Sequence, residues 1–525
     1  MDATSPGRAV TAASALARAA LRPERPDRLP RAMLAMAVWG PTMAGGVAGA
    51  TARYPTAAAL IDEDGALSYC DLWIVTDAMA RGLRARGVGP ASTVGVLARN
   101  HRGFVTSVVA AAKLGTDVVY LNTGFAGPQL ADVVAHEAID TVLYDDEFAD
   151  IVEGAGAPLT VSESELAALG AERSYLPLLP TRRTGRMVVL TSGTTGRPKG
   201  ATRSSMGGVD ALTPMLSTVP IRSRDTVVIP SPLFHSWGLA HLGIGLGMSS
   251  TAVLHRHFDP EQTLAAIAEH QADGLVVVPV MLQRILALGG EVIARYDTSS
   301  LRYIASSGSA LGATLATAVI RRFGPILYNI YGSTEVSLAT VAGPADLQAA
   351  PATAGPPAPG SVVRVLDEAG RELGPDEVGR VFVGSQSRFE GYTGGGGKEE
   401  IEGLLSSGDL GHFDRRGRLF IDGREDDMIV SGGENVFPAE VEDLLAAHPG
   451  VAEAAVVGIA DDEFGQRLKA FVVRRPGARL TEKQVKDHVH SHLARYKVPA
   501  AVEFVAALPR TTTGKLRRLD LLGHG

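Results

Sequence analysis

The segment VVLTSGTTGRPKGA, residues 188–201, joins a short β-branched run to a loop of glycines, hydroxyl side chains and one lysine. Backbone N–H groups that glycines leave unobstructed form an anion-binding nest, and a lysine adds a mobile positive charge. A P-loop of the G-x-x-x-x-G-K-[S/T] type is excluded, because a glycine follows Lys199 and two residues separate it from Gly196. We expect a phosphate-binding loop of a different type. Its candidate ligands are Thr191, Ser192, Gly193, Thr194, Thr195, Gly196 and Lys199.

Short apolar runs recur between helical stretches over the first two thirds of the chain. Continuous apolar strands that end in Gly, Ser or Pro are typical of a parallel sheet covered by helices on both faces. Ligands of such sheets bind at the carboxyl ends of the strands, where polar clusters follow in this chain. The runs are residues 187–190, 226–230, 275–279, 302–308 and 326–332.

From about Gly360 the pattern changes to strands separated by turns, which predicts a small β-rich subdomain at about residues 340–425. A compact α+β unit follows. We therefore expect an α/β protein with a large N-terminal domain of layered α/β subdomains, a small β-barrel-like subdomain and a small C-terminal α+β domain. The predicted divisions are an N-terminal extension at 1–50, the N-terminal domain at 51–425 and the C-terminal domain at 426–525.

The length and composition of the chain exclude several classes of protein. A chain of 525 residues is too long for one core and should form two or more domains. Its net charge of −7 argues against nucleic acid as a partner. A single cysteine excludes an intrachain disulfide framework, so the reducing cytosol is the expected compartment. The first 30 residues lack the pattern of a secretory signal.

The uncharged segment 33–50 is mostly Ala and Gly and contains Pro41. It only just reaches the roughly 17–25 residues that a membrane-spanning helix needs. We expect it to pack on the body of the protein. The sequence leaves open whether the protein contacts a membrane peripherally and whether it forms a homodimer.

The decapeptide TSGTTGRPKG (191–200) resembles the phosphate-loop signature of the adenylate-forming superfamily, which includes acyl-CoA synthetases, luciferases and peptide-synthetase adenylation domains. Further signatures follow in the order of that superfamily, so the resemblance covers nearly the whole chain. They are PLFHSWG (232–238), SSGSAL (306–311), NIYGSTE (329–335), SGDLGHFD (407–414), GREDDMIVSGGENVFPAEVE (423–442) and LPRTTTGKLRR (508–518).

The resemblance implies that the chain binds ATP with Mg²⁺ and joins a carboxylic acid to coenzyme A. Glu335 follows a strand and offers the oxygen ligand that Mg²⁺ prefers. Thr334 is placed to bond a phosphate, and Tyr331 offers a ring face to adenine. Asp409 is suited to the two ribose hydroxyls, and the superfamily pattern brings Arg424 to the same sugar. The other implied nucleotide-binding residues are Gly308, Ser309, Ala310, Gly332 and Ser333.

Lys515 carries the strongest mechanistic prediction. Adenylation brings a carboxylate to the α-phosphate, and a lysine between the two anions offsets their repulsion. The alternative is that Lys515 belongs to a solvated basic tail.

The resemblance also implies that the C-terminal domain rotates about a hinge at Asp426 between two half-reactions. Ser431, Gly432 and Gly433 would then let the pantetheine arm of coenzyme A pass. His235 resembles the gate between the acyl pocket and the thiol tunnel, against the alternative of a packed core histidine.

The chain departs from the superfamily pattern before the ribose aspartate. G-W-x-x-T-G-D is usual there, whereas this chain reads EGLLSSGDLG, and GGGGKEE replaces a Pro-Glu-x-Thr element. The packing of this loop is therefore not predicted by the resemblance.

The sequence thus predicts an AMP-forming acyl-CoA synthetase. Residues 236–250, rich in Gly, Ala and Leu, favour a medium- or long-chain fatty acid as the substrate, against the alternative of an ordinary core helix with small packing residues. Two alternatives stay open: an acyl-AMP ligase that delivers the acyl group to a carrier protein, and a non-catalytic nucleotide- or acyl-binding regulator.

Overall fold

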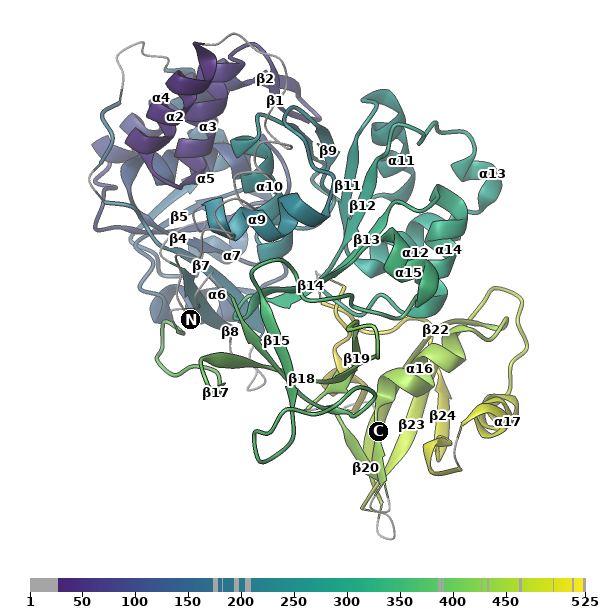
Figure 1. The fold of residues 1–525 in the computed structure, drawn as a ribbon. Helices are drawn as coiled ribbons and strands as arrows, with labels where there is room; N and C mark the ends of the chain where they lie inside the picture. Colours follow the sequence, from purple (N-terminus) through teal and green to yellow (C-terminus); the bar gives the residue numbers. More distant parts are fainter. Residues whose placement is uncertain are drawn as a thin grey trace.

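The structure is a computed structural model of the chain. It confirms the predicted α/β fold, with a large N-terminal domain of several sheets and a small C-terminal α+β domain (Figure 1). It describes residues 27–172, 178–181, 183–192, 198–203, 209–385, 389, 391–425, 427–431, 434–461, 465–493, 495–511 and 514–522.

The first sheet has six strands in the order β6-β5-β3-β4-β7-β8, all parallel except the last, which returns antiparallel to β7. The strands are β3 (Thr93–Leu97), β4 (Asp117–Tyr120), β5 (Thr141–Tyr144), β6 (Leu159–Ser162), β7 (Met187–Ser192) and β8 (Pro198–Arg203). The helical segments between β2 and β7 in the chain are α4 (Tyr69–Ala85), α5 (Arg102–Leu114), α6 (Gly127–His136), η1 (Asp146–Phe148), α7 (Ala149–Glu153) and α8 (Glu163–Ala171). The hairpin β7–β8 carries the predicted phosphate loop.

The second sheet has eight strands in the order β14-β13-β12-β11-β9-β10-β1-β2, with antiparallel strands only at its two ends. The predicted apolar strands are thus divided between two sheets, since only β7 belongs to the first. The strands are β1 (Ala58–Asp62), β2 (Gly65–Ser68), β9 (Thr226–Val228), β10 (Thr251–Val253), β11 (Gly274–Val277), β12 (Tyr303–Ser306), β13 (Leu327–Ser333) and β14 (Ser337–Ala342). The remaining helices of the N-terminal domain are α2 (Arg28–Trp39), α3 (Met43–Arg53), α9 (Val209–Thr218), α10 (Ser236–Gly247), α11 (Pro260–Glu269), α12 (Pro279–Ala287), α13 (Gly290–Ile293), α14 (Ala313–Phe323) and α15 (Pro344–Ala349).

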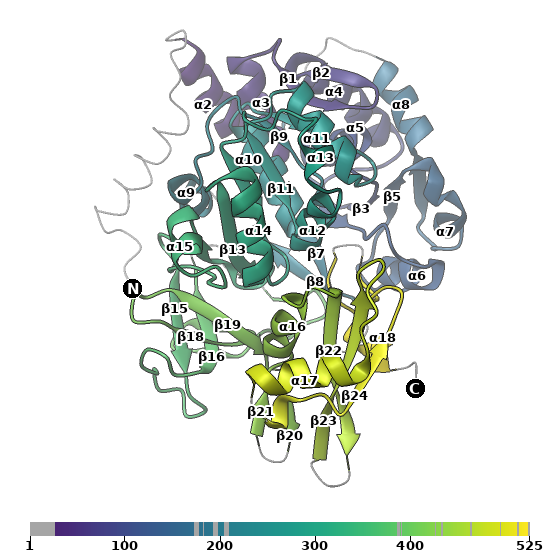
Figure 2. The same cartoon turned by 90° about the vertical axis from the view of Figure 1, so that its right-hand side faces the viewer.

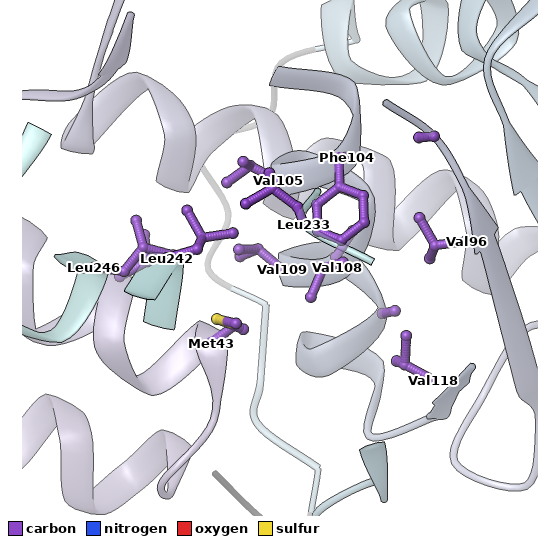
Figure 3. Close-up of a cluster of buried hydrophobic side chains, with 14 of the residues drawn as sticks. Met43, Val96, Phe104, Val105, Val108, Val109, Val118, Leu233, Leu242 and Leu246 are labelled. Carbon is purple, nitrogen blue, oxygen red and sulfur yellow. The ribbon is translucent and has the colours of Figure 1, made fainter. Parts of the chain in front are cut away.

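Helix α5 lies in the core that joins these two sheets. It begins where the His101 side chain accepts a hydrogen bond from the backbone of Gly103, and it ends at Gly115, which has a left-handed conformation (φ 70°). Figure 3 shows its apolar side chains against those of α3, α10 and neighbouring strands. Each such side chain contributes roughly 1.5–3 kcal/mol when fully buried, so this packing holds the strand ends of both sheets in a fixed relation. The labelled α5 residues are Phe104, Val105, Val108 and Val109.

A third, antiparallel sheet follows, and the C-terminal domain forms a fourth. In both views the C-terminal domain is a separate unit below the N-terminal sheets, beside the third sheet (Figures 1 and 2). The third sheet consists of β15 (Val362–Leu366), β16 (Gly379–Gly384), β17 (Glu400–Ile401), β18 (Leu404–Phe413) and β19 (Leu419–Arg424). The C-terminal domain contains β20 (Ile429–Ser431), β21 (Glu434–Val436), α16 (Pro438–Ala446), β22 (Val451–Asp461), β23 (Gly465–Arg474), α17 (Glu482–His492), η2 (Arg495–Lys497), β24 (Ala501–Phe504) and α18 (Arg518–Leu522).

The apolar segment 33–50 is divided between α2 and α3, and α3 is largely buried against the body. Among the described residues, no helix has the length and apolar character needed to cross a membrane. The cytosolic location, the membrane contact and the homodimer stay predictions.

Candidate active site

The phosphate loop connects β7 to β8, whose register pairs Thr191 with Lys199. Lys199 is exposed at the start of β8, and its Nζ lies 5.5 Å from the centre of the Tyr392 ring. The predicted ligands Gly193, Thr194, Thr195 and Gly196, and the side chains of Thr191 and Ser192, lie outside the described residues.

Glu335 lies in the turn between β13 and β14 and is buried. Its Oε2 accepts a hydrogen bond from the Ser333 hydroxyl at 2.9 Å, and its Oε1 accepts one from the Tyr392 hydroxyl at 3.0 Å. No described residue forms an ion pair with this carboxylate. A buried carboxylate held by two neutral hydroxyls keeps further lone pairs for a hard cation, so the residues present fit Mg²⁺.

Two neighbouring residues complete this turn. The Thr334 hydroxyl lies 3.4 Å from the Ser236 hydroxyl at the start of α10. Gly332 lies where the register between β13 and β14 shifts, and an added Cβ there would stand 2.0 Å from the carbonyl oxygen of Ser337. Glycine is therefore required for this close approach of the two strands.

Asp409 and Arg424 face each other on β18 and β19, as paired residues of the two strands. The distance between Arg424 Nη1 and Asp409 Oδ1 is 3.7 Å, and Tyr331 donates a hydrogen bond to Asp409 Oδ2 at 2.6 Å. Burial raises the pKa of Asp409, while Tyr331 and Arg424 oppose that rise. The structure therefore brings three of the predicted nucleotide-binding residues together.

The predicted adenine slot lies at the carboxyl end of β12. Gly308 has a φ of 93°, and an added Cβ would stand 3.3 Å from Val278 Cγ1. Gly308, Ser309 and Ala310 are all exposed, so the edge of this strand is open to a flat ligand.

Lys515 enters the site from the C-terminal domain. The preceding Gly514 (φ 80°) packs on the side chain of Val280 in α12, which docks this loop against the N-terminal domain. Lys515 is exposed to solvent, yet partial desolvation and the positive charge of Arg424 lower its pKa. Glu335 and Asp409 act in the opposite direction. Two carboxylates and a guanidinium from the N-terminal domain thus lie within electrostatic reach of this amine.

His235 immediately precedes α10, and its Nε2 is buried without a hydrogen-bond partner among the described residues. Burial, assisted by the positive charge of Lys515, lowers the pKa of His235 to about 3. The imidazole is therefore neutral at physiological pH and can turn without breaking a hydrogen bond of that nitrogen.

The predicted hinge and pantetheine residues Asp426, Gly432 and Gly433 lie outside the described residues, as does the side chain of Ser431. The backbone of Ser431 ends β20 and pairs with Glu434 and Gly465. Next to the hinge position, Asp427 forms an ion pair with Arg518 at 3.2 Å.

Two residues near these groups were not predicted from the sequence. Tyr392 contacts Glu335, and the Nζ of Lys398 lies 3.3 Å from the position that a Cβ on Gly408 would take, close to Asp409. Lys398 belongs to the GGGGKEE stretch that departs from the superfamily pattern, and Tyr392 lies two residues before that stretch. That departure was the only signal in the sequence, and it did not indicate which side chains return to the site.

Family models, sequence relatives and solved structures each match most of the chain. The sequence matches the family described as AMP-binding enzyme over residues 47–393 and the AMP-binding enzyme C-terminal domain over residues 440–515. It is 33% identical to the indoleacetate–CoA ligase of Aromatoleum aromaticum, over 87% of this chain and 92% of that relative. It is 32% identical to the fatty acid–[acyl-carrier-protein] ligase ScoC of Streptomyces coeruleorubidus, over 89% of this chain and 93% of that relative. The crystal structure of ATP-bound MatB from Rhodopseudomonas palustris is similar with a TM-score of 0.80 at 28% identity, covering 91% of this chain and 98% of that one.

Proposed function

The chain belongs to the AMP-binding enzyme family, as an AMP-forming acid–thiol ligase, and we propose that its acid is a medium- or long-chain fatty acid. The reaction has two steps. A carboxylate oxygen attacks the α-phosphorus of ATP, which gives an acyl-adenylate and releases pyrophosphate. The thiolate of coenzyme A then attacks the acyl carbon, and AMP leaves.

The observation that carries the proposed mechanism is the convergence of Lys515, Glu335 and Asp409 from separate sheets and from both domains. In the first step, Lys515 lies between the attacking carboxylate and the α-phosphate and offsets their mutual repulsion. Asp409 and Arg424 hold the ribose, and the phosphate loop with Lys199 holds the β- and γ-phosphates. Positioning and charge supply nearly all of the rate enhancement in such a transfer.

Glu335 is the residue that would hold Mg²⁺, with Thr334 bonding a phosphate beside it. The ion, when bound, neutralises charge on the phosphate oxygens.

For the second step, rotation about Asp426 would withdraw Lys515 and bring residues 431–433 to the site. His235 is neutral and half-buried at the start of α10, which suits a gate that moves aside for the thiol without carrying charge into the tunnel.

Helix α10 supports the apolar acid. Its sequence SWGLAHLGIGLG contains no Arg or Lys, so it offers no partner for a second carboxylate on the substrate. Each methylene that the enzyme buries contributes about 0.8 kcal/mol. Activity should therefore rise with chain length up to the length of the pocket. The named activity of ScoC, a fatty acid ligase with a carrier-protein acceptor, supports the acid and keeps the other acceptor as an alternative.

Pyrophosphate release with and without coenzyme A, over butyrate, octanoate, palmitate and indoleacetate, tests this proposal. We expect kcat/KM to increase by up to about 100-fold from butyrate to octanoate, since four more methylenes contribute roughly 3 kcal/mol. A preference for indoleacetate would contradict the fatty acid. Pyrophosphate release with octanoate but no octanoyl-CoA would favour the carrier-protein alternative.

A further inference from the structure

The segment Gly391–Thr393 adds a short strand to the edge of the first sheet. The backbone of Thr202 donates to Gly391 at 3.2 Å, and Thr393 donates to Gly200 at 2.9 Å, on either side of an antiparallel pair between Ala201 and Tyr392. These bonds fasten the segment to β8, the strand that leaves the phosphate loop. The backbone of Tyr392 is therefore held even though four glycines follow it closely.

The Thr393 side chain adds a second anchor. Its hydroxyl donates to Glu137 Oε1 at 2.7 Å, next to the end of α6. The Phe389 ring packs edge-on against Tyr392, with ring centres 5.0 Å apart. Backbone pairing, a side-chain hydrogen bond and a ring contact thus restrict the orientation of Tyr392 from three directions.

Tyr392 lies beside two charged side chains, Glu335 and Lys199. Its hydroxyl donates to Glu335 Oε1 at 3.0 Å, and the Nζ of Lys199 lies 5.5 Å from its ring centre. An ammonium within about 6 Å of an aromatic ring is attracted to the ring face. One side chain therefore links a carboxylate at the end of β13 to a lysine on β8.

The two hydrogen bonds on Glu335 fix the plane of its carboxylate. Ser333 donates to one carboxylate oxygen and Tyr392 donates to the other. A tyrosine hydroxyl ordinarily titrates near pH 10, so it is a donor at physiological pH. Outer partners that orient a metal-binding side chain typically change metal affinity by about 10–100-fold when they are removed.

We propose that Tyr392 is a positioning residue for the metal–nucleotide complex, since it orients Glu335 toward Mg²⁺ and holds Lys199 beside the phosphates. This inference rests on the proposed role of Glu335. It predicts that loss of the Tyr392 hydroxyl alone weakens the binding of ATP with Mg²⁺ and leaves the binding of ATP without Mg²⁺ unchanged.

The test is the variant Tyr392→Phe, which keeps the ring over Lys199 and removes only the hydroxyl. Calorimetric titration with α,β-methylene-ATP, which prevents turnover, gives the Kd in Mg²⁺ and in EDTA. We expect Kd in Mg²⁺ to rise about tenfold and Kd in EDTA to change by less than about twofold. Tyr328→Phe is the matched control, because the Tyr328 hydroxyl donates no hydrogen bond to the described residues.

Coupling to Glu335 separates positioning from a general structural effect. In a Glu335→Gln background, Tyr392→Phe should have almost no further effect on Kd in Mg²⁺, because the group that it orients is gone. Equal loss of affinity in Mg²⁺ and EDTA, or full additivity of the two substitutions, would overturn the proposal. If the unaltered protein releases no pyrophosphate with any acid, the proposed function fails, whereas the nucleotide titrations still decide the role of Tyr392.

Discussion

Replacing Lys515 by alanine should abolish most of the first half-reaction and spare the second. The lysine lies within electrostatic reach of Glu335, Asp409 and Arg424 and is exposed to solvent. An effective dielectric constant of about 20 is therefore appropriate, and at about 4 Å one charge–charge contact is worth roughly 4 kcal/mol. Removal of the lysine also removes its repulsion with Arg424, which offsets part of the lost stabilisation. We expect adenylation to slow by roughly 10²–10³-fold, since each 1.36 kcal/mol is about tenfold in rate.

The two half-reactions are measured separately. Rapid quenching in a single turnover gives the rate of acyl-adenylate formation from ATP and octanoate. Supplying octanoyl-adenylate with coenzyme A gives the rate of thioester formation, which should stay within a few-fold of the unaltered enzyme. Arg517→Ala is the control, because Arg517 is exposed two residues away and pairs with Asp520 at 3.0 Å. Adenylation by Lys515→Ala within tenfold of normal, or an equal loss in both half-reactions, would refute this reasoning.

The remaining predictions concern pH, nucleotide affinity and stability. Desolvation and the charge of Arg424 lower the pKa of Lys515 below 10.5, so the amine loses its charge at a lower pH than a free lysine. The rate of single-turnover adenylation should therefore decline on the alkaline side. Lys515→Arg should move that decline to higher pH. Asp409→Ala removes a carboxylate acceptor worth about 1.5–3 kcal/mol, so the KM for ATP should rise by about 10–100-fold in steady-state assays. Arg518 pairs with Glu442 and Asp427 inside the C-terminal domain; because these groups are partly exposed, Arg518→Ala should lower the free energy of unfolding by about 2 kcal/mol in urea titrations.

The fold class could be predicted because the apolar strands are short, β-branched and followed by polar residues. The sequence could not divide those strands between sheets. Strand β7 pairs with β4 in the first sheet, whereas β9 pairs with β10 and β11 in the second. An apolar run indicates that a strand is buried, but it does not indicate which strand it pairs with. The choice depends on the packing of α3, α5 and α10 between the sheets, which the sequence pattern does not display.

The candidate site could be predicted where its residues lie inside short motifs. Resemblance to the superfamily indicated Glu335, Asp409 and Lys515, and the structure places them within electrostatic reach of one another. Their roles stay predictions. Tyr392 could not be predicted, because its bond to Glu335 joins residues 57 positions apart through a strand added to β8. Glycines on both sides of that segment favour a loop by composition, whereas the backbone bonds to β8 come from tertiary structure.

Lys515 lies on the C-terminal domain, and two contacts dock that domain against the N-terminal domain. Gly514 has a positive φ (80°), and an added Cβ would stand 2.4 Å from Val280 Cγ1, so a side chain there would disturb the contact that precedes Lys515. At a second contact of the C-terminal domain, Asp443 Oδ1 of α16 lies 3.3 Å from where a Cβ on Gly312 would stand, and desolvation raises the pKa of Asp443 to about 6. Desolvation of the ionised Asp443 carboxylate is unfavourable, so it makes the docked arrangement less stable. An interface that combines a close glycine contact with an unfavourable carboxylate holds Lys515 in place without strong binding, which suits the proposed rotation of the C-terminal domain before thiol attack.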